Sequence, residues 1–320
     1  MSLSGQVALV TGASRGIGRG IALQLGEAGA TVYITGRPSN QSDNQQAGLS
    51  TLEETANEIT QRGGKGIAVF VDHTDMVQVE KLFEKINEEN QGQLDILVNN
   101  AFQAVNVISH SIGQKFHTLD PYIWDTINNV GLRNHYFCSV YASRTMVKRN
   151  KGLIVNIGSA GGLQYLFNVA YGVGKAAVDR MTADMAEELK DSNICVVSIW
   201  PGIVKTELLG KYINEKDNAL SQDKTNAEFI ATGETTEYAG RAIVAVANDR
   251  KRMAKSGKIL IAADLGCKYG FKDVDGVRPP NMRSVNYVLK HFGWNRTAWW
   301  IPNFVKIPTS LLWASTNRFG

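Results

Sequence analysis

Near its start the chain passes from a short apolar run, Val7–Val10, into a glycine-rich turn, Thr11–Gly18, and then into a helical pattern. A wholly apolar run of this length is typical of a parallel strand that is covered on both faces. Gly12, Gly16 and Gly18 let the chain turn sharply and let another group approach the backbone closely. A strand, a glycine turn and a helix in this order predict the first βα unit of an α/β fold.

Strand-like and helical segments keep alternating along the chain. Further strands are predicted at Thr31–Thr35, Gly66–Val71, Leu94–Val98, Leu153–Ile157, Cys195–Ile199 and Lys258–Ile261. Besides the helix after the glycine turn, helices are predicted over about 51–61, 121–149 and 170–190, and after an N-cap at Asp75 with Gln78 at the capping-box position. The predicted fold class is α/β, a doubly wound parallel sheet of Rossmann type in three layers. It covers residues 1–265, and an aromatic-rich C-terminal extension covers 266–320.

The glycine turn also has the features of a dinucleotide-binding site. A helix N-terminus offers free N–H groups and the positive end of the helix dipole, and glycine lets a pyrophosphate reach the backbone. The spacing is G-x-x-x-G-x-G rather than the commoner G-x-G-x-x-G. A plain glycine-rich turn is the alternative, but the strand before it and the helix after it favour the binding site. The candidate residues are Gly12, Ser14, Arg15, Gly16, Ile17 and Gly18.

The end of the second predicted strand indicates which dinucleotide binds. A site for NAD usually has an acidic residue there, which takes the ribose 2′-hydroxyl. This chain has Arg37 instead, and Arg37 with Arg15 could hold a 2′-phosphate by charge-assisted hydrogen bonds. The alternative is that both are ordinary surface arginines. The sequence therefore favours NADP(H).

A second motif, Tyr171-Gly-Val-Gly-Lys175, lies on the helix predicted over 170–190. Residues four apart stack on one helix face, so the phenol and the ammonium are expected side by side. A neighbouring cation favours the phenolate and moves a tyrosine pKa of about 10 toward neutral pH, as a general acid/base requires. Such pairs also arise by chance, so the rest of the chain decides what this one means.

Together with the glycine turn, these residues resemble the short-chain dehydrogenase/reductase family. The resemblance covers about residues 5–265. It rests on short motifs that follow successive strands: Val71-Asp72, Asn99-Asn100-Ala101, Ser159, Tyr171 with Lys175, and Pro201-Gly202 with Thr206. The stretches 124–133, 163–169 and 200–204 resemble one branch of the family in particular.

The resemblance implies three catalytic residues. Ser159 would hydrogen-bond the substrate oxygen, and Tyr171 would exchange the proton with it. Lys175 would hold the nicotinamide ribose and tune Tyr171.

The resemblance also implies further cofactor contacts. Asp72 would hold the adenine ring, and Asn99 would stabilise the strand end beside the cofactor. Val204 and Thr206 would bind the carboxamide. Tyr171 and Lys175 also count among the cofactor-binding residues.

Two positions depart from the family pattern. Phe102 stands where the family usually has the glycine of an N-N-A-G motif, and it brings a large ring to the substrate side. Gly131 stands where many members carry an asparagine that helps to hold a proton-relay water. Asn128 and Asn129 lie nearby, but on a regular helix they point elsewhere. The relay is then expected to use another group or bulk water.

These residues favour NADPH-dependent reduction of a carbonyl to an alcohol, with hydride from the nicotinamide and the proton from Tyr171. An apolar ketone or aldehyde of steroid, lipid or xenobiotic type suits the substrate-side loops best. Their apolar residues, some of which are expected to pack in the core instead, are Phe102, Leu163, Tyr165, Leu166, Phe167, Leu208 and Leu209. The alternative, which Gly131 favours, is an NADP(H)-binding protein of low turnover that acts as a sensor or scaffold.

The composition gives little support to nucleic-acid binding, a disulfide framework or a metal site. The formal net charge is only +4 and no long basic block occurs, which gives nucleic-acid binding little support. Three scattered cysteines form no disulfide framework, and five histidines show no metal-ligand spacing, so no metal is expected. No secretory signal is visible, and a cytoplasmic location is expected. Peripheral contact with an intracellular membrane, such as the endoplasmic reticulum, and a homo-oligomer are additional expectations.

The segment beyond about residue 266 lies outside the family pattern. Between residues 297 and 317 the only charged residue is Lys306, and Pro302 and Pro308 interrupt any long helix. Four of the six tryptophans fall in this segment: Trp294, Trp299, Trp300 and Trp313. Tryptophan and lysine beside short apolar segments suit the headgroup zone of a bilayer. We expect the tail to form part of the substrate entrance and to rest on a membrane through 294–313. The alternative is that it packs over the substrate mouth or against a second subunit.

Overall fold

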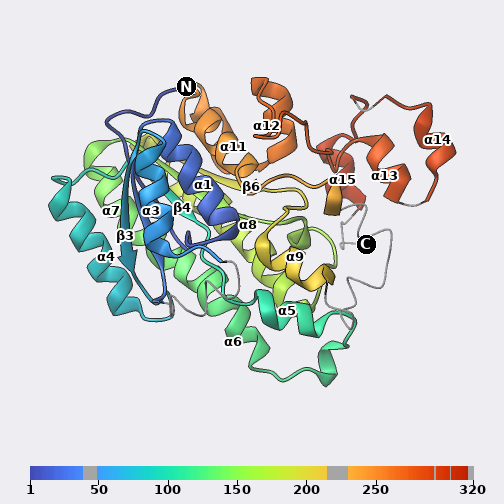
Figure 1. Cartoon of the computed structure of the whole chain (residues 1–320), viewed down its shortest axis with the longest axis horizontal. Coiled ribbons are helices and arrows are strands. Elements are labelled where there is room, and N and C mark those ends of the chain that lie inside the picture. The colour runs from blue at the N-terminus through green and yellow to red at the C-terminus, as the bar shows by residue number, and fades with distance from the viewer. Residues whose placement is uncertain (39–48, 215–229, 292, 303, 316–320) are drawn as a thin grey trace.

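The computed structural model describes the chain except residues 39–48, 215–229, 292, 303 and 316–320 (Figure 1). In the described part, seven parallel strands form one sheet in the order β3-β2-β1-β4-β5-β6-β7. The strands are β1 (Val7–Val10), β2 (Thr31–Gly36), β3 (Lys65–Phe70), β4 (Ile96–Asn99), β5 (Gly152–Ile157), β6 (Ile194–Trp200) and β7 (Ile259–Ile261). Each lies within two residues of its predicted bounds. The strand order reverses between β1 and β4, so a ligand crevice is expected at their carboxyl ends.

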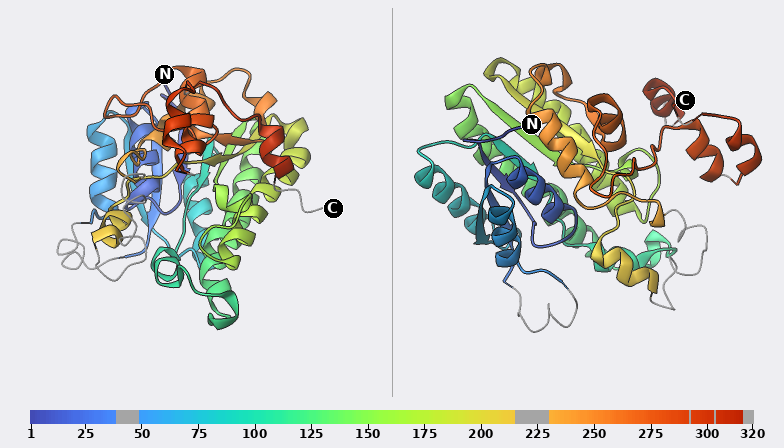
Figure 2. Two further views of the ribbon diagram at one scale, coloured as in Figure 1. Left: turned by 90° about the vertical axis from the view of Figure 1, so that its right-hand side faces the viewer. Right: turned by 45° about the horizontal axis from the view of Figure 1, so that its top comes forward.

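Helices cover both faces of the sheet, which confirms the three predicted layers (Figure 2). One face carries α1 (Gly16–Glu27), α3 (Leu52–Gln61), α11 (Tyr238–Ala247) and α12 (Ala262–Tyr269). The other carries α4 (Met76–Glu89), α7 (Asn134–Arg149) and α8 (Val169–Leu189). A separate cluster of buried apolar side chains fills the space on each face. β1, which lies between these clusters, is buried along its whole length, as its wholly apolar run predicted.

Asp75 begins α4 as predicted. Its carboxylate accepts hydrogen bonds from the N–H groups of Val77 and Gln78. The Gln78 side chain does not close a capping box onto Asp75. Its Oε1 instead accepts a hydrogen bond from the Asp72 N–H, at 3.0 Å. The start of α4 therefore helps to fix Asp72 at the end of β3.

The helix predicted over 121–149 is present but interrupted. It consists of α6 (Ile123–Asn128), a π-helical segment (Asn129–Arg133) and α7. A π turn uses i→i+5 hydrogen bonds, so it changes the direction in which the preceding side chains point relative to the following helix.

The remaining elements are short. They are α5 (Val105–Ser111), α9 (Glu207–Asn214) and 3₁₀ turns at Phe116–Thr118, Ala160–Gly162, Lys190–Ser192 and Arg252–Lys255. Residues 38–50, a polar stretch rich in Gln, Asn and Ser, lie mostly outside the described residues.

The C-terminal extension projects from one end of the body (Figures 1 and 2). It contains α13 (Val285–His291), α14 (Asn295–Trp299) and α15 (Thr309–Ser315), short helices as the prolines predicted. In the described part of the chain, no helix is long and apolar enough to cross a membrane. The division of the chain at residue 265 stays a prediction, and α12 runs across that position.

The Asp264 carboxylate is one of the groups that connect this extension to the body. Asp264, on α12, forms ion pairs with Arg283 and Lys306 at 2.7 and 2.6 Å. It also accepts a hydrogen bond from Asn281 Nδ2 at 2.8 Å. Ser284 and Lys306 form an antiparallel bridge beside these contacts.

Candidate active site

The glycine turn packs directly against the end of β4. Gly12 has φ +67°, and a Cβ there would lie 2.7 Å from the Ala101 Cα. A Cβ on Gly18 would lie 2.2 Å from the Gly12 carbonyl oxygen. Both distances are shorter than real contacts allow, so these two positions require glycine. The close packing brings the N-terminus of α1 to the crevice where the strand order reverses.

The N-terminus of α1 holds an anionic group in this structure. The Gly16 N–H donates a hydrogen bond to Glu207 Oε2 at 3.0 Å, and the Thr206 side chain lies beside the same glycine. This carboxylate oxygen stands in for the kind of oxygen that a pyrophosphate carries. The turn therefore fits the predicted dinucleotide. It also brings the predicted carboxamide residue Thr206 next to Gly16.

We expect Glu207→Gln to tighten NADPH binding by about 3- to 10-fold. A pyrophosphate at the N-terminus of α1 must replace the Glu207 carboxylate, and glutamine competes less and does not repel the phosphates. Fluorescence titration with NADPH would measure the change, with Glu84→Gln on α4 as a matched control. Unchanged or weaker binding by Glu207→Gln would show that the carboxylate does not compete.

The adenosine-side candidates lie at the ends of β2 and β3. Arg37 directly follows β2 and is exposed, and Arg15 is the N-cap residue of α1. Hydrogen bonding from the Thr74 backbone holds the pKa of Asp72 below its usual range, and the charge of Arg37 adds to that effect. Arg37 and Asp72 therefore lie close enough to interact. The Ser14 side chain packs near Gly36, at the end of β2.

Asn99 braces the strand ends beneath the site. It is fully buried, and its Nδ2 donates to Ser139 Oγ at 2.9 Å and to Asn156 Oδ1 at 2.8 Å. These bonds join β4 to β5 and α7. Val204, the other predicted carboxamide residue, is buried in a bridge with Glu234.

The three predicted catalytic residues converge at the carboxyl end of β5. Ser159 follows that strand, and its Oγ accepts a hydrogen bond from the Gly161 N–H at 3.1 Å. The Asn168 side chain caps α8 by accepting from the Tyr171 N–H at 2.9 Å. Lys175 donates from Nζ to the carbonyl oxygen of Ile157, the last residue of β5, at 2.9 Å.

The pKa of Tyr171 does not shift in the direction that its pairing with Lys175 predicted. Burial raises the pKa of Tyr171, and a hydrogen bond with Ser159 acts in the opposite direction. The predicted net lowering by Lys175 is therefore wrong for this arrangement. The reason is geometric, since Lys175 Nζ is turned toward Ile157 and lies 6.0 Å from the centre of the Tyr171 ring. Burial also lowers the pKa of Lys175, to about 8.

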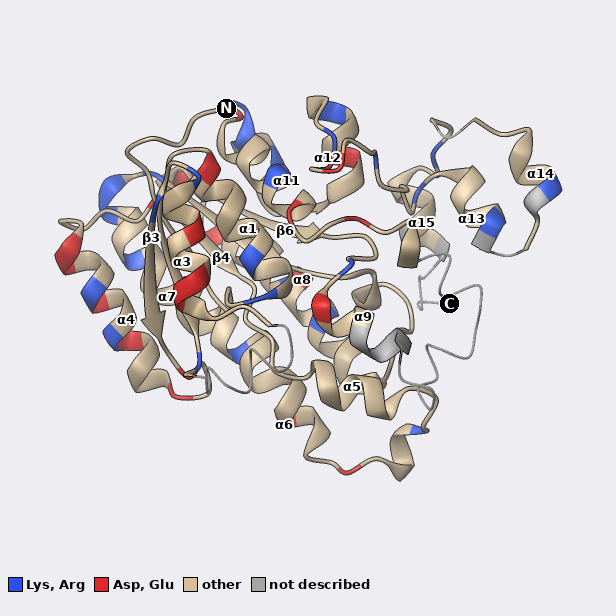
Figure 3. Cartoon of the chain, viewed as in Figure 1, with Lys and Arg blue, Asp and Glu red and all other residues tan. Residues whose placement is uncertain are grey.

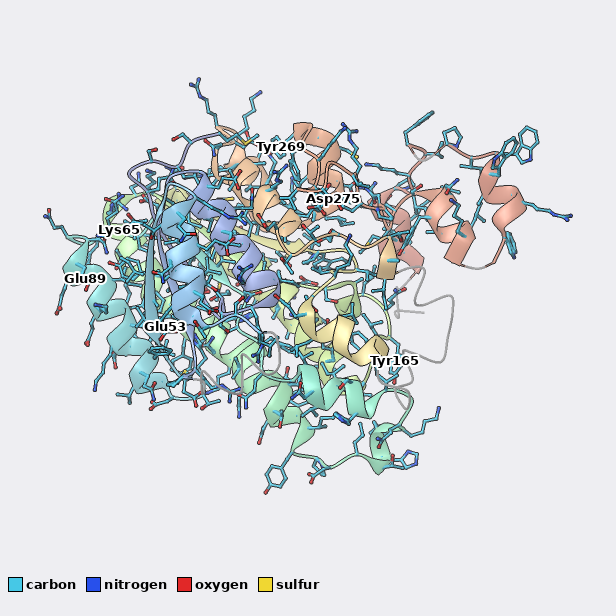
Figure 4. The ribbon with its side chains drawn as sticks, in the orientation of Figure 1. Glu53, Lys65, Glu89, Tyr165, Tyr269 and Asp275 are labelled. Carbon is cyan, nitrogen blue, oxygen red and sulfur yellow. The ribbon has the colours of Figure 1, made fainter. Side chains whose placement is uncertain are left out.

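Two phenyl rings enclose Tyr171. Phe102 and Phe167 each present an edge-to-face contact to it, with ring centres 6.1 and 5.1 Å away. Phe167 has φ +65°, in the left-handed region that bulky residues rarely adopt. A strained backbone that holds a ring against Tyr171 is a typical property of a functional site. Leu166 also packs in this cluster, while Tyr165 projects from the loop before α8 and is mostly exposed (Figure 4).

The structure explains the glycine at position 131. A Cβ there would lie 2.8 Å from Cδ2 of Phe102, so the two unusual residues of this chain fit each other. Asn128 lines the same narrow cavity as Tyr171 and Lys175, and its Oδ1 has no hydrogen-bond partner among the described residues. The expectation that Asn128 points elsewhere is therefore wrong. It assumed a regular helix, and the π-helical segment changes the direction of the side chain.

Residues 6–217 match the sequence model of a protein family that is described as short chain dehydrogenase. The chain belongs to the short-chain dehydrogenase/reductase family. Dehydrogenase/reductase SDR family member 1 of Homo sapiens is 46% identical over 323 residues, which cover 99% of this chain and 99% of that protein. This confirms the family resemblance and the branch that the stretches 124–133, 163–169 and 200–204 indicated.

Two other family members are similar over most of the chain. The NADPH-dependent aldehyde reductase 2, chloroplastic, of Arabidopsis thaliana is 30% identical and covers 75% of this chain and 86% of its own. A solved structure described as a 2-deoxy-D-gluconate 3-dehydrogenase from Agrobacterium tumefaciens, with bound NADP, has a TM-score of 0.65 and 26% identity. It covers 81% of this chain and 95% of its own. As a short-chain dehydrogenase/reductase, the protein is an oxidoreductase that uses a nicotinamide cofactor on small-molecule substrates.

Two residues at this short-chain dehydrogenase/reductase site were not predicted to lie there. Glu207 follows Thr206 directly, so its position in the sequence could have indicated it. No pattern in the sequence indicates the direction of Asn128. Among the described residues, no group of three or more His, Cys, Asp and Glu side chains is placed to hold a metal ion.

Proposed function

We propose that this short-chain dehydrogenase/reductase uses NADPH to reduce the carbonyl of an apolar ketone or aldehyde, of steroid, lipid or xenobiotic type, to an alcohol. The observation that carries the proposal is the convergence of Ser159, Tyr171 and Lys175 at the end of β5, beside the glycine turn. A nicotinamide held along that turn supplies hydride when it is bound.

Each of the three residues then has a defined task. Ser159 Oγ donates a hydrogen bond to the carbonyl oxygen and orients it toward Tyr171. Tyr171 Oη gives its proton to that oxygen as negative charge develops. The positive charge of Lys175, 6.0 Å from the centre of the Tyr171 ring, stabilises the phenolate that remains after proton transfer, although burial keeps the pKa of the resting phenol raised. The rings of Phe102 and Phe167 exclude water from the phenol and strengthen these interactions.

NADP(H) is the proposed cofactor form. Arg37 stands at the end of β2, where an NAD-specific site has an acid, and its exposed guanidinium forms no ion pair with any described residue. Arg15 at the start of α1 is the second proposed partner of the 2′-phosphate. The NADPH named for the Arabidopsis relative and the NADP bound in the Agrobacterium structure support this choice.

The apolar lining supports the proposed substrate class. Phe102, Leu166 and Phe167 are partly buried beside Tyr171, so an apolar body next to the carbonyl would extend their packing. NADPH consumption with a panel of steroid, lipid-derived and aromatic ketones, and with small polar carbonyls as controls, tests the proposal. Turnover confined to the polar carbonyls would contradict the substrate class. The low-turnover alternative is not favoured, because Gly131 accommodates the ring of Phe102.

The extension is proposed to rest on an intracellular membrane. No Asp or Glu occurs after Asp275, and the basic residues there give the projecting part only positive charge (Figure 3). Trp294, Trp299 and Trp300 are 62, 76 and 78% exposed. Exposed tryptophan beside positive charge suits an anionic bilayer surface. The side chain of Trp313 lies outside the described residues. The alternative is that a second copy of the chain covers this surface in a homo-oligomer.

We expect the full chain to float with anionic liposomes and the triple variant Trp294→Ser, Trp299→Ser, Trp300→Ser to remain in the soluble fraction. Substitution is preferred to truncation at residue 265, because truncation would also remove the contacts that Phe271 and Asp273 make with the body. Neutral liposomes are the control. If the wild-type chain does not float, membrane contact is rejected, and sedimentation of both proteins then tests self-association.

A further inference from the structure

Tyr171, Lys175 and Asp179 follow one another at four-residue intervals on α8, so they lie along one face of that helix. The first two belong to the proposed catalytic set, and the third has no assigned role. Asp179 Oδ1 accepts a hydrogen bond from Ser198 Oγ at 2.6 Å and from Trp200 Nε1 at 3.0 Å. Both donors belong to the last residues of β6. The carboxylate is therefore held in place by the sheet.

Lys175 is held by the neighbouring strand. Its Nζ donates to Ile157 O, and Ile157 pairs with Ile199 of β6. The side chain is 9% exposed, so its ammonium has lost most of its hydration. A buried ammonium needs a compensating charge to stay protonated.

The groups around Lys175 identify that charge. His135, on α7, is buried and its pKa is lowered to about 3, chiefly by burial, so it is neutral. Tyr171 is a neutral phenol whose pKa is raised by burial. The ring of Phe102 lies 5.2 Å from Nζ and offers only its π face. Among the described residues, Asp179 is the one carboxylate whose charge acts on Lys175.

We propose that Asp179 is a positioning residue that acts through Lys175: its carboxylate, fixed on β6 by Ser198 and Trp200, keeps the buried ammonium charged and so in the form that serves Tyr171. This inference rests on the roles proposed above for Tyr171 and Lys175.

The two charges then define a pH window. Burial raises the pKa of Asp179 to about 6, against the effects of Ser198, Trp200 and Lys175. Burial lowers the pKa of Lys175 to about 8, against the effect of Asp179. Below about pH 6 the carboxylate is protonated, and above about pH 8 the ammonium is lost. Both charges are present together between these values.

The test is a direct titration of Lys175 in the full chain. Protein labelled with lysine carrying ¹³C at Cε reports its protonation by NMR, with Lys175→Met to assign the signal. In Asp179→Asn the midpoint of Lys175 should fall by about 1 pH unit, because the charge is gone. Asparagine still accepts hydrogen bonds from Ser198 and Trp200, so the fold should be kept. Asp184→Asn, which removes an exposed carboxylate from the same helix, should leave the midpoint unchanged.

Turnover gives the second measurement. The alkaline limb of the kcat profile should move to lower pH in Asp179→Asn by the same amount as the Lys175 midpoint, while the KM for NADPH changes little. An unchanged Lys175 midpoint overturns the inference, even if kcat falls. A shifted midpoint together with an active Tyr171→Phe variant would instead contradict the proposed function and leave the charge coupling intact.

The wild-type protein provides a test if Asp179→Asn fails to fold. The Cε signal of Lys175 should show a second, smaller inflection near pH 6, as Asp179 becomes protonated. Absence of that inflection would overturn the inference.

Discussion

Tyr171→Phe is expected to abolish carbonyl reduction while NADPH binding and the fold are kept. The substitution removes only the hydroxyl that would give its proton to the substrate, and losing a positioned general acid costs about 10²–10⁴-fold in rate. The ring remains, and with it the contacts to Phe102 and Phe167. Steady-state NADPH consumption measures the loss, and thermal unfolding and NADPH titration measure what is kept.

Two variants complete this experiment. Tyr165→Phe removes the hydroxyl of an exposed tyrosine in the loop before α8 and should keep near-wild-type turnover. Ser159→Ala should lose activity without losing NADPH binding. Near-wild-type turnover in Tyr171→Phe would refute the assignment of the proton donor.

Arg37→Asp is expected to weaken NADPH binding by about 100-fold and to leave NADH binding nearly unchanged. A 2′-phosphate would lose a charge-assisted hydrogen bond and meet a like charge in its place. NADH has a hydroxyl at that position, and an aspartate at the end of β2 can accept the hydrogen bond that this hydroxyl donates. Parallel titrations of wild type and variant with both cofactors give the ratio of the two affinities.

A matched control separates local from general charge effects. Arg250→Asp makes the same change at an exposed arginine in the turn after α11, away from the strand ends that form the site. It should leave the ratio of NADPH to NADH affinity unchanged. Equal affinity of the wild-type protein for both cofactors would show that Arg37 does not select the phosphate.

The sheet could be predicted from the sequence because burial on both faces leaves a simple signal. β5 and β6 are buried along their whole length, and both appear in the sequence as mostly apolar runs, with Asn156 and Ser198 as the polar exceptions. The glycine turn was equally clear, since Gly12 and Gly18 are required by backbone contacts within one βα unit and with the end of β4.

The missed features depend on a local change of helix type and on packing between segments far apart in the chain. The direction of Asn128 follows from a π-helical segment, and the glycine at position 131 is explained by the ring of Phe102. The sign of the Tyr171 pKa shift depends on how deeply the phenol is buried and on where Lys175 turns. Neither burial depth nor side-chain rotation has a local sequence pattern.

The attachment of the C-terminal extension has a consequence for how such an enzyme can diversify. The extension contacts the body through Asp264, Phe271 and Asp273, which are remote in sequence from the glycine turn and from the residues around Tyr171. Its exposed tryptophans lie in or directly beside α14, which is not part of the sheet. Substitutions there leave the packing around the strands untouched. The exposed surface of the extension and the lining of the site can therefore change independently, by mutations in separate parts of one gene.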